Sequence, residues 1–168
     1  MSPTVSMAQL ADPVRRRLYV VLAKRALGLE TGSAVLDWAY EALADGWDSG
    51  PLAILAGLDK PPNEFEIDRY LAEALRSLNI EPLDRDGLVT AWGLGLAHDL
   101  VAGAISPRDG CRGLSNLWRT AGFPERYLPF YLADEQLGLA DEGIYGTAEA
   151  VAEDILKTAR HLVETAPH

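Results

Sequence analysis

Histidines are the residues best suited to acid–base or metal chemistry near neutral pH, and this chain has only three: His98, His161 and His168. His98 and Asp99 are adjacent on a predicted helix, as metal ligands can be, but no histidine precedes them to complete a site. No Glu-x-x-His spacing typical of a di-iron helical bundle is present. The segment Gly93-Leu94-Gly95 lacks the third glycine of a nucleotide-binding loop. The sequence therefore predicts no catalytic residues and no cofactor.

Arginines recur on one side of the helix predicted for residues 106–122. Arg108, Arg112 and Arg119 fall within a narrow arc of that helix, with Ser115 on the same arc. A guanidinium group can hold a carboxylate or a phosphate by two parallel hydrogen bonds. An alternative function is therefore a small-ligand-binding protein or an enzyme that uses this face with nearby carboxylates, although a solvated helix face gives the same pattern. Its ligand-binding residues are Arg108, Arg112, Arg119, Tyr127 and Tyr131.

Adjacent carboxylates offer oxygen ligands for a divalent cation. Such pairs occur at Asp134–Glu135, Asp141–Glu142 and Glu153–Asp154. The spacing of a calcium-binding loop is absent, and adjacent carboxylates in an acidic protein are usually solvated. We therefore expect no metal site.

The cellular compartment is indicated by the cysteine content and by the first residues. The single cysteine, Cys111, cannot form an intramolecular disulfide, which favours a reducing compartment. It lies on the apolar side of its predicted helix, and we interpret it as buried and unreactive. Residues 1–12 lack the basic-then-apolar order of a signal peptide, and the apolar run of residues 18–23 is too short to span a membrane. We expect a cytoplasmic protein that does not bind membranes.

The charge of the chain is strongly acidic and unevenly distributed. There are 25 Asp and Glu against 15 Lys and Arg, for a formal net charge of −10. Acidic residues predominate in residues 29–99 and again in residues 134–168, whereas the segments between and before them are weakly basic. Acidic surfaces repel a nucleic-acid backbone and speed the encounter with cationic partners. The sequence therefore favours a basic protein partner and argues against nucleic acid.

Two acidic segments carry aromatic residues suited to binding a protein. The first is the loop at residues 45–51, where Trp47 lies between Asp45 and Asp48. The second is the pair Asp134 and Glu135, which follows an aromatic run over residues 118–131. Tryptophan and tyrosine are frequent interface anchors. In the competing interpretation, Trp47 packs on the core as part of a helix end, and most of the aromatic run is core.

Start and stop signals for helices recur along the whole chain, and no convincing period-two alternation predicts a strand. Expected helix starts are Asp12-Pro13, Ser33, Ser49, Asn63, Asp84 or Asp86, Ser106-Pro107, Pro129 and Thr147, with stops at Gly28, Gly46 and Gly122. Phe65, Leu71, Leu75 and Leu78 are expected to form a core stripe. We predict an all-α fold, a single compact domain of seven to eight helices over residues 12–165, after a flexible N-terminus at residues 1–11. A duplicated helical hairpin is a further possibility, since Gly46 to Pro51 is echoed at residues 103–107.

The segments at residues 36–43, 46–49 and 54–58 resemble parts of small uncharacterised bacterial helical proteins. This resemblance implies a bacterial helical domain and no activity. In size, acidity and helicity the chain is also similar to bacterial immunity proteins and antitoxins. The function expected is a non-enzymatic acidic protein-binding module, in its most concrete form an immunity- or antitoxin-type inhibitor of a basic partner.

Overall fold

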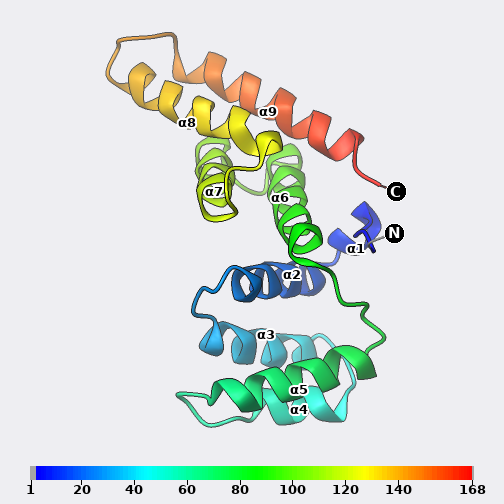
Figure 1. Ribbon diagram of the computed structural model, residues 1–168. Coiled ribbons are helices and arrows are strands. Elements are labelled where there is room, and N and C mark those ends of the chain that lie inside the picture. The colour runs from blue at the N-terminus through cyan, green and yellow to red at the C-terminus, as the bar shows by residue number, and fades with distance from the viewer. Residues whose placement is uncertain (1–2, 168) are drawn as a thin grey trace. The chain divides into compact units, whose positions relative to one another are not determined.

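The computed structural model describes residues 3–167, and within that range every regular element is helical (Figure 1). This confirms the predicted all-α class. The elements are α1 (Met7–Leu10), α2 (Pro13–Ala26), α3 (Gly32–Ala44), α4 (Gly50–Ala56), α5 (Glu64–Ser77), α6 (Arg85–Ala102), α7 (Pro107–Thr120), the 3-10 turn η1 (Glu125–Tyr127), α8 (Leu128–Asp141) and α9 (Ala148–Glu164).

The backbone contacts divide the chain near residue 88 into two compact units. Unit 1 ends at Leu88 and unit 2 begins at Val89, so that α6 starts in the first and lies mostly in the second. Each unit is described by itself below. The expectation of one domain over residues 12–165 stays a prediction, as does the duplicated hairpin.

The short helix α1 lies in the segment that was expected to be flexible. Ser6 and Gln9 form a capping box, in which each side chain accepts a hydrogen bond from the other residue's backbone N–H, at 3.3 and 3.0 Å. Val5 and Leu10 are buried. The boundary expected at residue 12 stays a prediction; residues 1 and 2 lie outside the described range.

Most helices begin at a short polar residue that accepts a hydrogen bond from the first turn, as the sequence predicted. Asp12, Ser49, Asn63, Ser106 and Thr147 all cap in this way. Asp84 accepts from the N–H of Gly87 at 2.7 Å, which resolves the choice between Asp84 and Asp86. Ser33 was a wrong prediction: α3 already begins at Gly32, after Thr31.

Six helices end in the same way, at a residue with positive φ that is followed by a backbone bond to the last turn. The N–H of the next residue donates to the carbonyl five positions earlier, for example Trp47 to Ala42 and Ile144 to Leu139, each at 2.9 Å. This is the Schellman motif, which satisfies carbonyls that the helix leaves unpaired. The left-handed residues are Gly28, Gly46, Asn79, Gly103, Gly122 and Gly143.

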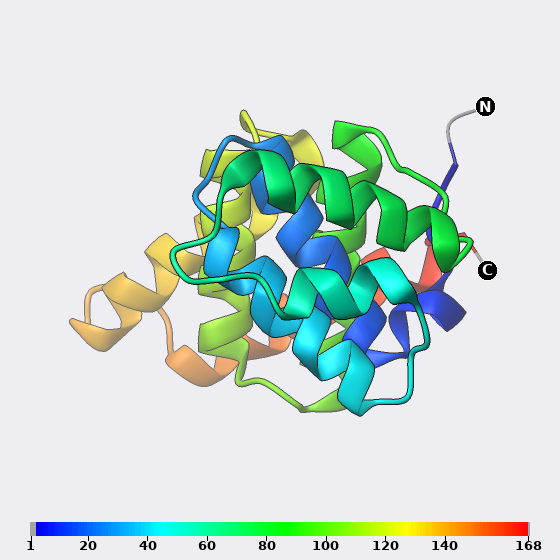
Figure 2. The same ribbon diagram turned by 90° about the horizontal axis from the view of Figure 1, so that it is seen from below.

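The core of unit 1 lies among α2, α3, α4 and α5, and Figures 1 and 2 show α4 packed beside α3 and α5. Trp38 at its centre has no exposed surface, and its indole N–H donates to the carbonyl of Val14 at 3.0 Å. Phe65 does not belong to this core, because 85% of it is exposed. It lies two residues before the buried Ile67, about 200° away around the helix axis.

The core of unit 2 depends on a close approach between α6 and η1. The Tyr127 side chain is 1% exposed and its hydroxyl donates to the carbonyl of Val89 at 3.2 Å. A Cβ atom on Gly93 would lie 2.1 Å from this hydroxyl oxygen and 2.4 Å from Cζ. Only glycine therefore lets the tyrosine ring lie against α6 at this point.

Candidate protein-interaction surface

Helices α7 and α8 pack against each other in unit 2, joined through η1, and α9 lies along α8 (Figure 1). Their side chains pair accordingly: Arg108 donates to Asp141 at 2.8 Å, and the Cys111 thiol donates to the carbonyl of Phe130 at 3.0 Å. The interface between α7 and α8 contains most of the candidate site residues that were predicted in this unit.

Three aromatic rings and one arginine lie together at one end of the interface between α7 and α8. Tyr131 is stacked on Trp118, with ring centroids 4.4 Å apart and planes at 24°. Phe123 meets Trp118 edge-on, with ring centroids 4.8 Å apart, and the Arg119 guanidinium lies 5.3 Å from the Tyr131 centroid. We call Trp118, Arg119, Phe123 and Tyr131 the aromatic cluster. It remains accessible, because 63% of Phe123 is exposed and Trp118 and Tyr131 are only half-buried.

The geometry of the chain after α7 places Phe123 in this cluster. Gly122 and Phe123 both have positive φ, at 83° and 65°. The N–H of Phe123 donates to the carbonyl of Trp118 at 2.8 Å, which closes the Schellman turn and directs the ring back onto that helix end. Positive φ is rare for a residue with a bulky side chain.

The predicted acidic pair lies one turn along α8 from Tyr131, and its two members have different surroundings. Asp134 is half-buried towards α7, where its charge helps to raise the pKa of Arg108 and of Cys111. Glu135 is exposed and, within residues 3–167, makes no ion pair. Glu135 is therefore the member available to a partner.

Burial dominates the chemistry of Cys111. The residue has no exposed surface, and burial, reinforced by the negative charge of Asp134, raises the pKa of its thiol to about 12. The thiolate, which is the reactive form of cysteine, is therefore suppressed at neutral pH. The predicted burial of Cys111 is confirmed.

The arginine face of the alternative function does not form one open site. Arg108 is engaged by Asp141, whose hydrogen bond and charge raise the pKa of the guanidinium. Arg119 lies over Tyr131, while Arg112 is exposed. Tyr127, the further residue named for that alternative, does not lie on this face: it is 1% exposed and packs against α6.

The outer face of α8 carries apolar residues that the sequence analysis did not select. Leu132 and Leu139 are 49% and 40% exposed, and at the tip of the α8–α9 hairpin Ile144 and Tyr145 are 67% and 60% exposed. The seven-residue spacing of the two leucines places them on one side of the helix, away from the buried Leu137. From the sequence, this spacing shows that the two leucines share one side of the helix, but not that this side is exposed.

The other predicted binding loop lies in unit 1. Trp47 is half-buried against the core, edge-on to Trp38 with centroids 6.0 Å apart. It is the residue that closes the Schellman turn of α3, so the structure agrees with the interpretation of Trp47 as part of a helix end. Asp45 and Asp48 are exposed.

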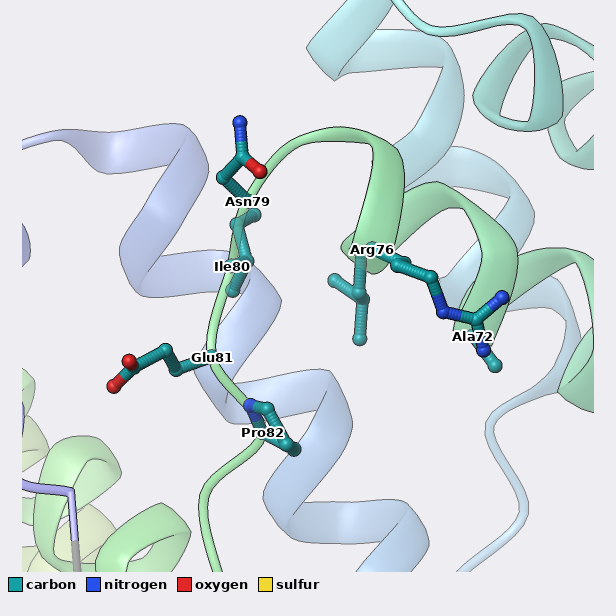
Figure 3. Close-up of a pocket in the computed structure, with 7 residues that line it drawn as sticks. Ala72, Arg76, Asn79, Ile80, Glu81 and Pro82 are labelled. Carbon is teal, nitrogen blue, oxygen red and sulfur yellow. The ribbon is translucent and has the colours of Figure 1, made fainter.

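A cavity of about 550 Å³ lies where α5 ends, also in unit 1 (Figure 3). Its walls include Leu75, Ile80 and Pro82. Its charged side chains do not converge, since Arg76 and Glu81 point to opposite sides. Ligand sites normally combine apolar walls with a few convergent polar groups, and this cavity has only the walls.

The described part of the chain holds neither a cluster of metal-ligating side chains nor a helix that could span a membrane. Residues 3–167 contain no group of three or more histidine, cysteine, aspartate or glutamate side chains placed to hold a metal ion. Across the same range, no helix has both the length and the apolar character to cross a bilayer. Comparison with known proteins gave no relative either: no family model, no curated protein and no solved structure matches this chain.

Proposed function

We propose that this protein is a non-enzymatic acidic binding module for a basic protein partner. The observation that carries the proposal is the aromatic cluster on unit 2, which is accessible and is followed along α8 by the exposed carboxylate of Glu135. The cytoplasm, where a lone cysteine stays reduced, is the proposed compartment.

The composition of the aromatic cluster supports binding to a protein. Tryptophan, tyrosine and arginine are the residue types most enriched among those that dominate interface affinity. The exposed ring of Phe123 adds apolar area beside them. Rings held by stacking lose little side-chain entropy on binding, so their contact area contributes more to affinity.

The charge of the protein supports a basic partner. The net charge is −10, and Glu135 and Glu142 on α8 make no ion pair within the described residues. Carboxylates near an interface mainly steer the encounter, so they raise the association rate of a cationic protein. An inhibitor of the immunity or antitoxin type, which covers a basic surface of its target, is the most concrete form of this proposal.

The test is affinity capture from an extract of the native host, followed by binding measurements with the purified partner. We expect one basic protein to be retained at low salt and released at high salt. Phe123→Ala should raise Kd by roughly 30-fold, since an anchor residue contributes about 2 kcal/mol. Glu135→Gln should mainly slow association.

Phe65→Ala is the matched control, because it removes an exposed phenylalanine from unit 1, and it should leave Kd unchanged. Thermal melts of each variant separate a lost contact from a lost fold. The proposal fails if no basic protein is retained, or if the two phenylalanine variants bind the partner equally well.

A further inference from the structure

The exposed side of α8 has a regular pattern beyond the aromatic cluster. Leu132, Glu135, Leu139 and Glu142 follow one another at spacings of three, four and three residues. All four are exposed, and Glu142 is the C-cap residue of the helix. We call these four residues the α8 seam.

Alternation of three- and four-residue spacings is the heptad repeat by which one helix packs along another. The leucines occupy one of the two contact positions of the repeat, and the glutamates occupy the other. The seam therefore presents two apolar and two acidic positions in alternation. The two leucines lie about 10.5 Å apart along the helix axis, as do the two glutamates. A helix with the complementary pattern would meet every one of them.

We propose that the α8 seam binds an amphipathic helix of the partner, with apolar residues seven apart at one contact position and Lys or Arg seven apart at the other. This inference rests on the proposed function and names the kind of element that is bound. Ile144 and Tyr145, exposed at the hairpin tip, extend the apolar contact beyond the end of α8.

Charge selects this occupant over a second copy of the chain. Glu135 and Glu142 make no ion pair in the described residues, and another α8 would bring two more glutamates to the interface without a base to meet them. Like charges at facing helix positions disfavour pairing, whereas Lys or Arg there would form interhelical ion pairs. The seam therefore fits a basic helix.

Synthetic peptides test this inference directly. The first is a three-heptad peptide with leucine at one contact position and lysine at the other; the second has glutamate in place of each lysine; the third has the composition of the first in scrambled order. Fluorescence anisotropy with the full-length protein should show the lysine peptide binding at least roughly tenfold more tightly than the other two.

A charge-reversed protein provides the decisive comparison. Glu135→Lys/Glu142→Lys should reverse the preference, so that the glutamate peptide binds more tightly. Glu149→Lys/Glu153→Lys is the matched control, because it makes the same change in net charge on the exposed side of α9, and it should keep the preference for the lysine peptide. Circular dichroism checks that both variants keep their helices.

Three results would overturn the inference: equal binding of the lysine and scrambled peptides, no reversal in the seam variant, or reversal in the α9 variant as well. These outcomes are separate from a failure of the proposed function, which is the absence of a basic partner. If a captured partner binds Glu135→Lys/Glu142→Lys as tightly as the wild type, the proposed function still holds, but the α8 seam is not the binding site.

Discussion

Gly93→Ala is the substitution for which the structure gives the clearest energetic expectation. The new methyl carbon would lie 2.1 Å from the Tyr127 hydroxyl oxygen and 2.6 Å from Cε1, far inside van der Waals contact. The Tyr127 ring is rigid and the residue is 1% exposed, so η1 must move away from α6. The hydrogen bond from the Tyr127 hydroxyl to the Val89 carbonyl must then lengthen or break. Overpacking of this kind costs about 1–3 kcal/mol, and a buried hydroxyl that loses its partner costs about 1–3 kcal/mol more.

Alanine also favours a helix over glycine by about 1 kcal/mol, which offsets part of that loss. The net expectation is a destabilisation of about 3 kcal/mol, seen as a fall in Tm of about 6–12 °C in a thermal melt followed by circular dichroism. Gly138→Ala is the matched control: a Cβ there would meet nothing within 4 Å, so helix propensity alone should raise Tm. A Gly93→Ala protein that melts at or above the wild-type temperature would refute the packing described for Tyr127.

Three further predictions concern single side chains. Cys111 should react slowly with a thiol reagent in the folded protein and rapidly in urea. Because its folded pKa of about 12 lies above the ordinary value of 9.0, its contribution to stability should be constant below pH 9 and should fall between pH 9 and pH 12. Cys111→Ala should remove this fall from the pH dependence of the free energy of unfolding. Ser115→Ala should leave Tm unchanged or raise it, because within the described residues the buried Ser115 hydroxyl oxygen accepts and donates no hydrogen bond, whereas a bonded hydroxyl would give a loss of about 1 kcal/mol. Trp47→Ala should lower the free energy of unfolding by about 3 kcal/mol and leave partner affinity unchanged. Asp45→Asn and Asp48→Asn should change the free energy of unfolding by less than about 0.5 kcal/mol. A Trp47→Ala protein with a normal Tm and weakened binding would show that this loop contacts the partner.

Local signals in the sequence were sufficient to predict most of the helices, although α1 was not among them. A capping residue or a helix-terminating glycine acts through hydrogen bonds to its own turn, so Asp12, Ser106 and Gly122 could be recognised without knowledge of the fold. Asn79 was not recognised as a helix end, although asparagine adopts positive φ more readily than most residues. Ser33 was misassigned as a cap because the N-cap of α3 lies two residues earlier, at Thr31, whose side chain makes no capping hydrogen bond.

The candidate surface depended on long-range packing and could be predicted only in part. The run of aromatic residues was visible, but which rings are core was decided by partners distant in sequence. Tyr127 fills the space left by Gly93, and Tyr131 instead stacks on Trp118. The exposure of Leu132 and Leu139 depends on which side of α8 its neighbours cover, and a periodic pattern alone does not show that side.

At Phe123, a backbone conformation that lowers stability carries the side chain that we propose contacts the partner. A non-glycine residue in the left-handed region costs about 1 kcal/mol, and this chain places there an exposed phenylalanine where glycine would be unstrained. Phe123→Gly should therefore relieve the strained backbone and remove the ring in one step, so that a selection for heat resistance alone would favour the variant that has lost the proposed anchor. Directed evolution for thermostability would therefore act directly against the contact that we propose for this ring.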